Sequence, residues 1–205
     1  MFLRVFGGLT AASLALCLVW WTVLKGDESS VLSVAPFGLI VFAIPAATAL
    51  AFWIIARRTD QRTAVVAQTH PNVALHQFMA DTPAVLALRR LGSENGGRRI
   101  RSLNGAYVTV VVDRGSLWIY AGASAWLVAR VDTARVARVE PARISTTRGG
   151  WWPGVRFQIA DQAGSALVID VLPIRVARGT LRKSLDVAGE LSAIRNELEA
   201  SAATQ

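Results

Sequence analysis

The sequence has little cysteine, lysine or histidine: Cys17 is its single cysteine, and two lysines and two histidines stand among 205 residues. One cysteine excludes an intramolecular disulfide and a cysteine-based metal cluster. The histidines, His70 and His76, are six positions apart and so face different sides of a helix, with only Asp60 and Asp81 as nearby carboxylates. We therefore expect solvated histidines, no metal site and no cofactor.

Catalytic motifs are also absent from the sequence. It contains no G-x-S-x-G nucleophile elbow and no glycine-rich phosphate loop with its lysine. The aspartates Asp113, Asp161 and Asp186 fall in expected turns or on a helix surface, where carboxylates are ordinary. We expect no catalytic residues, and a protein that is not an enzyme.

Charged residues are missing from two long apolar runs, Val5 to Leu24 and Phe37 to Ala56. As a helix, a run of about 20 residues matches the roughly 30 Å hydrocarbon core of a bilayer. The runs predict a two-pass membrane protein with a transmembrane helical hairpin over residues 1–56. Because ion and proton pathways need ionisable groups, they argue against a channel or pump built from this chain alone.

The charges that flank the runs predict an orientation. Arg4 precedes the first run, the loop 25–36 carries one basic and two acidic residues, and Arg57, Arg58 and Arg62 follow the second run. The positive-inside rule then places both termini in the cytoplasm. The predicted localisation is the bacterial inner (plasma) membrane, with the C-terminal region on its cytoplasmic side.

Residues 57–97 have the mixed composition of a juxtamembrane connector with one or two short helices. Asp81, Thr82 and Pro83 predict a helix start, with an N-cap followed by proline at the first helical position, and Ala84 to Leu91 completes a short helix. A flexible break is expected at 93–97, so we place a domain boundary at residue 98.

From residue 98 the pattern becomes that of short β-strands separated by turns. A final helix is expected over Thr180 to Ala200, where apolar residues repeat every three or four positions, and 201–205 form a tail. The fold class is therefore α+β: a transmembrane hairpin, then a small antiparallel β-barrel or sandwich with a C-terminal capping helix. The expected strands are Ala106–Val112, Leu117–Tyr120, Trp126–Val131, Ala137–Ile144, Val155–Ala160 and Ala166–Leu172.

Three passages of this region resemble the bacterial pleckstrin-homology-like (PH-like) domain and its GRAM-type relatives. Val108 to Tyr120 is similar to the opening hairpin, Arg130 to Val139 to the strand, polar turn and apolar plug that follow it, and Leu181 to Leu198 to the closing helix. The resemblance covers residues 98–200 and departs from the family pattern around Ile100 to Leu103. It implies a two-pass membrane protein with a cytoplasmic PH-like domain.

Two groups of residues are candidate contacts with a partner or a membrane. Trp151 and Trp152 stand among glycines and a proline: exposed, they are an interface anchor or a membrane wedge, and buried, they form a lid over one end of the barrel, which is our expectation. The arginines attract anionic headgroups if they converge on one side, and add only solubility if they are dispersed. These arginines are Arg98, Arg99, Arg101 and Arg148.

The formal charge of +8, from 22 basic and 14 acidic residues, limits the classes of partner that we expect. Arginine-rich strands with few aromatic residues make a poor platform for single-stranded nucleic acid. We expect a non-enzymatic, membrane-anchored accessory or scaffold protein within a larger complex, with other integral membrane proteins as partners and anionic lipid headgroups as a further contact. The alternatives are a regulator that responds to anionic lipid through an arginine-rich face, and a membrane enzyme completed by a partner subunit.

Overall fold

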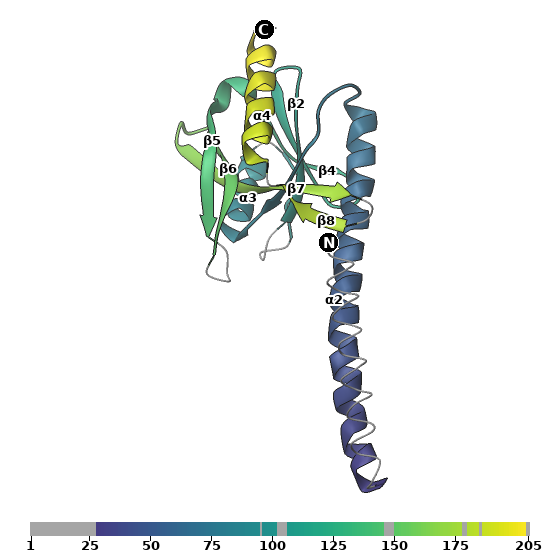
Figure 1. Cartoon of the computed structure of the whole chain (residues 1–205). Helices are drawn as coiled ribbons and strands as arrows, with labels where there is room; N and C mark the ends of the chain where they lie inside the picture. Colours follow the sequence, from purple (N-terminus) through teal and green to yellow (C-terminus); the bar gives the residue numbers. More distant parts are fainter. Residues whose placement is uncertain are drawn as a thin grey trace. The chain divides into compact units, whose positions relative to one another are not determined.

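The computed structural model describes residues 28–94, 96–101, 106–145, 150–177, 180–184 and 186–203. Within these ranges the chain forms three α-helices, α2 (Glu28–Thr69), α3 (Thr82–Glu94) and α4 (Val187–Ala202), and a short 3-10 turn, η1 (Thr133–Arg135) (Figure 1). The chain divides into two compact units, Met1–Ile54 and Ile55–Gln205. The strands are β1 (His76–Ala80), β2 (Ala106–Asp113), β3 (Ser116–Ala121), β4 (Trp126–Asp132), β5 (Val136–Ser145), β6 (Trp151–Ala160), β7 (Ala166–Ala177) and β8 (Thr180–Lys183).

The strands form one antiparallel sheet in the order β4-β3-β2-β1-β7-β6-β5, and β8 pairs with the C-terminal part of β7. Local hairpins build most of it. In the β2–β3 turn, Arg114 and Gly115 both have positive φ angles, of 48° and 72°, which is the conformation that a tight two-residue hairpin requires. Asp113 pairs with Ser116 directly across this turn.

One face of the sheet holds the main hydrophobic core. Alternate residues of β2, β3, β6 and β7 point into it, as the period of two predicts. Helix α3 packs against β7 and β4 and contributes Val85, Leu88 and Leu91, whereas α4 packs against β5 and β2 and contributes Leu191 and Ile194. Figure 1 shows α4, in yellow, lying along the sheet. On the opposite face, the C-terminal turns of α2 form a second, smaller apolar cluster with β2 and β3.

The predicted closed barrel or sandwich is wrong, because the sheet is open: its two end strands, β4 and β5, do not pair with each other. Other groups occupy both edges. The backbone N–H of Arg98 donates to the Leu127 carbonyl of β4 at 2.9 Å. On β5, Pro141 offers no N–H and Arg195 donates to the Val139 carbonyl at 2.7 Å, and both features block further strand pairing.

Two elements differ from the sequence prediction. The connector supplies β1, which lies between β2 and β7 in the middle of the sheet. The final helix starts at Val187 rather than Thr180, because Thr180–Lys183 pairs as β8 with the extended end of β7. Asp186 caps α4 by accepting a hydrogen bond from the Gly189 N–H at 2.9 Å.

The prediction of a membrane-spanning hairpin is also wrong. The run Phe37 to Ala56 is one part of a 42-residue helix, α2, that continues through charged turns to Thr69. Among the helices in the described ranges, none combines the length and apolar character needed to cross a bilayer. This finding overturns the two-pass membrane protein with a PH-like domain and the inner-membrane localisation with cytoplasmic termini. The other run, Val5 to Leu24, lies outside the described residues.

Candidate functional site

The end of the β5–β6 hairpin presents aromatic side chains on both faces of the sheet. Across the hairpin, Ser145 pairs with Trp151, Ile144 with Trp152, and Arg143 with Pro153. We call these six residues the hairpin tip. Trp151 is 69% exposed and Trp152 is 37% exposed, so the expectation that they form a buried lid is wrong.

The residues of the hairpin tip belong to strands rather than to a loop, because β6 already begins at Trp151 and β5 ends at Ser145. Ile144 belongs to a small apolar cluster with Ala142 and Leu172. Gly154 makes room for this cluster: a Cβ atom there would overlap the Ile144 side chain and lie 2.8 Å from the Val171 carbonyl oxygen. The two tryptophans are thus held on ordered strands.

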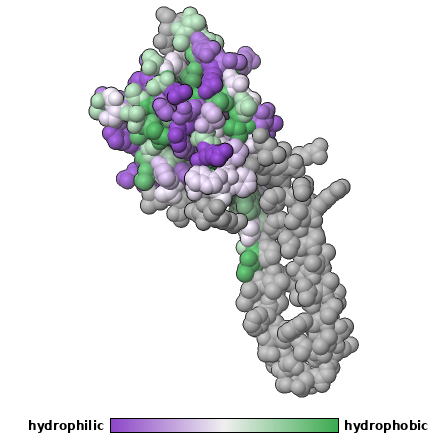
Figure 2. Space-filling model, turned by 60° about the vertical axis from the view of Figure 1, so that its left-hand side comes forward, coloured by the Kyte–Doolittle hydropathy of each residue, from purple (hydrophilic) through white to green (hydrophobic). Residues whose placement is uncertain are grey.

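Exposed large apolar residues are otherwise scattered over this unit. Figure 2 shows hydrophilic and hydrophobic residues interspersed over the coloured part of one face. The other large apolar side chains exposed in the described part of the Ile55–Gln205 unit are Val65 on α2, Leu86 on α3 and Val168 on β7. Among the described residues of the Ile55–Gln205 unit, the tryptophan pair is the one place where two such residues are adjacent in sequence.

Among the described residues, the exposed charge of the hairpin tip is the positive charge of Arg143. Arg143 is exposed, and no carboxylate of the described residues lies within ion-pair distance of it. The carboxylates of the neighbouring strands already have partners: Glu140 lies 3.3 Å from Arg138, and Asp170 accepts a bidentate pair from Arg156 at 2.7 and 2.9 Å.

The structure does not bring the predicted arginines together with the tryptophans. Arg98, Arg99 and Arg101 are exposed on the segment beside β4, at the opposite end of the strand order from β5. The Arg98 guanidinium stacks over the Trp126 ring, 5.0 Å from its centroid. Arg148, the fourth predicted arginine, lies outside the described residues.

His70, expected to be solvated, is instead 4% exposed and joins α2 to the β2–β3 hairpin. Its Nδ1 lies 2.7 Å from Asp113 Oδ2 and its Nε2 lies 2.8 Å from the Tyr120 hydroxyl. Trp118 stacks parallel to Tyr120, and the guanidinium of Arg130 covers Trp118. Burial, followed by the charge of Asp113, raises the pKa of Tyr120. These contacts hold α2 against the β2–β3 hairpin and so have a structural role.

His76 is equally buried and ties β1 to α4. Its Nδ1 lies 2.9 Å from Glu190 Oε2, and its Nε2 lies 3.2 Å from both carboxylate oxygens of Glu197. Burial alone lowers the pKa of His76, but the hydrogen bonds and charges of the two glutamates outweigh it and raise the pKa to about 9. The imidazolium is therefore the charge partner of two carboxylates from α4.

Arg62 is a buried cation that has no carboxylate partner among the described residues. It was expected to flank a membrane span, yet it is 2% exposed and lies against the sheet. Its Nε donates to Thr109 Oγ1 at 2.8 Å, whereas its Nη2 has no hydrogen-bond partner in the described part of the chain. Burial lowers the pKa of Arg62 to about 10. Gln77 pairs with Thr109 across β1 and β2, and its Oε1 also has no hydrogen-bond partner within the ranges that the structure describes.

Replacing both members of the Arg62–Thr109 pair should be tolerated better than replacing the threonine alone. Thr109→Val leaves a buried guanidinium without its acceptor and should lower the free energy of unfolding by about 2 kcal/mol. Arg62→Met with Thr109→Val removes the buried charge as well and should restore most of that loss. Urea denaturation of the three proteins measures this, and a double variant no more stable than Thr109→Val would contradict it.

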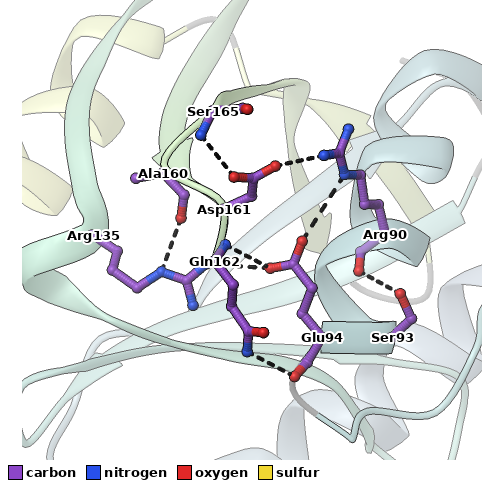
Figure 3. A network of polar contacts seen from close by, with 8 residues as sticks. All are labelled: Arg90, Ser93, Glu94, Arg135, Ala160, Asp161, Gln162 and Ser165. Atoms are coloured by element: carbon purple, nitrogen blue, oxygen red, sulfur yellow. Dashed lines mark hydrogen bonds and ion pairs between the residues drawn. The ribbon is translucent and has the colours of Figure 1, made fainter.

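A third polar network fastens α3 to the turn between β6 and β7 (Figure 3). Arg90 lies 2.5 Å from Asp161 Oδ2, and Asp161 accepts from the Ser165 N–H at 2.7 Å. Glu94 Oε2 lies 3.3 Å from Arg135 Nη2 and accepts from the Gln162 N–H at 3.3 Å. These contacts connect α3, η1 and the β6–β7 turn, so the network has a structural role.

The sequence did not predict the contacts of His70, the contacts of His76 or the Arg90–Glu94 network, because the residues in contact are distant in sequence. His70 and Asp113, for example, are 43 positions apart, so no local spacing signals the contact. Within the described ranges, no group of three histidine, cysteine or acidic residues is arranged to hold a metal ion. The hairpin tip remains the arrangement best suited to contact another molecule. Comparison of the sequence finds no matching family model and no matching curated protein.

Proposed function

We propose that this chain is a non-enzymatic scaffold protein that holds a partner protein at its hairpin tip. The observation that carries the proposal is the 69% exposure of Trp151 on a regular strand. A large aromatic side chain on a rigid support loses little conformational entropy on binding, and tryptophan is enriched among the residues that dominate interface energies.

The chemistry around Trp151 favours an acidic partner surface. Arg143 stands on the same face of the hairpin, two positions along the register, and has no carboxylate partner within the described residues. Arginine beside tryptophan is a typical composition for an interface hot spot. A partner that brings a carboxylate and an apolar pocket would match both groups.

The alternative, a lipid-responsive regulator with an arginine-rich face, has weaker support. Its arginines Arg98, Arg99 and Arg101 lie at the β4 end of the sheet order, away from the tryptophan pair on β6. Arg98 is also engaged with Trp126. These two groups of residues do not form one combined surface, which is what a lipid-reading face would need.

Photo-crosslinking can identify the partner, with Leu86 on α3 as a matched position of similar exposure. A benzophenone amino acid at position 151 should capture a protein that the same probe at position 86 does not. The captured protein is then purified and titrated against variants. Because hot-spot residues each contribute about 2 kcal/mol or more, Trp151→Ala with Trp152→Ala should weaken binding roughly thousandfold.

Two results would count against this function. One is equal capture at positions 151 and 86, and the other is a tryptophan double variant that unfolds instead of losing affinity. Leu86→Ala should leave binding unchanged, and Arg143→Lys should weaken it less than Arg143→Glu, because the charge is retained. Binding of the full chain to anionic vesicles that is lost on replacement of Arg98, Arg99 and Arg101, and kept in the tryptophan double variant, would support the lipid alternative.

A further inference from the structure

The backbone of β5 alternates between groups that bond to β6 and groups that point away from the sheet. The Val139 carbonyl points away, because it accepts from the Arg195 guanidinium of α4 at 2.7 Å. No register shift follows Val139, so the N–H and C=O groups of Arg143 and Ser145, an even number of positions further, point away as well. The residue opposite Arg143 agrees with this phase, since Pro153 has no N–H to donate across the hairpin.

Arg143 and Ser145 lie at an uncovered strand edge. β5 ends the strand order of the sheet, so no strand of the described residues pairs with its outer side (Figure 1). The two features that block pairing along β5, the contact at Val139 and the missing N–H of Pro141, both precede Arg143. Arg143 and Ser145 are exposed, and their outward N–H and C=O groups have no hydrogen-bond partner in the described part of the chain. An edge of this kind is a template for an extended segment of another protein.

The side chains beside this edge indicate what such a segment carries. Arg143, Ser145 and Trp151 share one face of the hairpin, since Trp151 pairs with Ser145 and Arg143 precedes Ser145 by two positions. On an added antiparallel strand, an acidic residue opposite Arg143 forms a cross-strand ion pair on that face. The residue two positions before the acidic one lies opposite the small Ser145, where a large apolar side chain reaches Trp151 across β5. Charge and size therefore favour an apolar residue two positions before an acidic residue.

We propose that the partner of the hairpin tip adds to the end of β5 as an antiparallel strand, with an apolar residue opposite Ser145 and an acidic residue opposite Arg143. This inference rests on the proposed function, because it states how the partner binds at that site. Directly opposite residues of antiparallel strands exchange backbone hydrogen bonds, so Arg143 and Ser145 each donate one bond to the segment and accept one from it. The backbone bonds supply affinity, and Arg143 and Trp151 select the sequence.

A synthetic peptide tests the strand pairing on the full chain. It is a fluorescein-labelled, threonine-rich peptide with tryptophan two positions before glutamate, and fluorescence anisotropy measures its dissociation constant. Ser145→Pro should raise this constant roughly tenfold, because proline removes an outward N–H that the sheet itself does not use. Ser145→Ala is the matched control: it keeps the N–H and should bind like the wild type. A peptide with tryptophan next to glutamate, which places the two on opposite faces, should also bind roughly tenfold more weakly.

Hydrogen exchange followed by NMR tests the same contacts without any substitution. Saturating peptide should slow exchange at the Arg143 and Ser145 N–H groups roughly tenfold or more, and should leave the Ala142 N–H, which faces β6, unchanged. No binding of the peptide, or binding without this protection, would overturn the inference. Binding that Trp151→Ala weakens and Ser145→Pro does not would reject strand addition alone and keep the hairpin tip as the binding site, so the inference and the proposed function can fail separately.

Discussion

Raising the pH from about 6 to about 10 should lower the free energy of unfolding by roughly 3 kcal/mol through His76 alone. The pKa of His76 is raised from its ordinary 6.5 to about 9 in the folded protein. Its contribution is therefore complete below about pH 6.5 and is lost as the pH rises through 9. Urea denaturation at one-unit pH intervals, followed by circular dichroism, gives the profile.

The charged groups that face His76 decide whether the pH dependence of the free energy of unfolding can be assigned to this residue. These are Glu190 and Glu197 of α4, with Arg175 of β7 lying 3.8 Å from Glu190. His76→Gln should be about 3 kcal/mol less stable than the wild type at pH 6 and nearly as stable at pH 10. Glu199→Gln, at an exposed position of the same helix, should keep the wild-type profile. An unchanged pH slope in His76→Gln would show that other groups cause it.

Gly97→Ala should be the most destabilising single-methyl substitution in the described part of the chain, with an expected loss of about 3 kcal/mol or more. A Cβ atom on Gly97 would overlap the Val128 carbonyl oxygen of β4, which is backbone and cannot rotate away. Gly92 approaches the same oxygen, since its Cβ would lie 2.6 Å from it. These two glycines let the end of α3 lie against the edge of the sheet.

Gly164→Ala distinguishes the effect of steric overlap at Gly97 from the effect of a positive φ angle alone. Gly164 has a φ of 79°, but a methyl group added to it would meet nothing within 4 Å, so alanine there should cost only about 1 kcal/mol. Thermal or urea unfolding of both variants gives the comparison. Equal losses of stability in the two variants would mean that β4 moves and so relieves the overlap at Gly97.

Local patterns predicted the hairpins well. The strands expected over 106–172 correspond to β2 to β7 with shifted ends, because short turns with their own sequence signatures join β2 to β3, β3 to β4 and β6 to β7. Asp113, Arg114 and Gly115 supply the clearest of these signatures. The helix start at Asp81 also follows from local chemistry, since its side chain accepts from the Ala84 N–H at 3.0 Å.

Features that depend on distant partners could not be predicted in the same way. His76–Ala80 is five residues long, has no adjacent hairpin partner and contains polar positions, so its sequence gives no strand signal. His70, His76 and Arg62 carry polar groups that usually remain in water, and only tertiary contacts show that they are buried. An apolar run likewise measures hydrophobic length without fixing where its helix ends, which is why the membrane hairpin was predicted wrongly.

The hairpin tip could be predicted from the sequence only in part. Its residues were identified from composition, because two tryptophans among glycine and proline are unusual. Their exposure was not predictable, since it depends on how far β5 and β6 extend past the residues that cover the core. The position of the arginines could not be predicted for a related reason. Arg98 and Arg101 share a segment, but no local signal shows which end of the sheet that segment lies beside.

The central position of β1 sets the order in which this domain can assemble. The β2–β3 and β3–β4 ribbons can form as soon as their own residues are available, because their contacts are local. Phe78, in contrast, pairs with Val108 on one side and Pro173 on the other. During synthesis β1 therefore has one bare edge until β7 has been made. A fragment beginning at residue 98, the boundary that composition suggests, would lack the strand that joins the two halves.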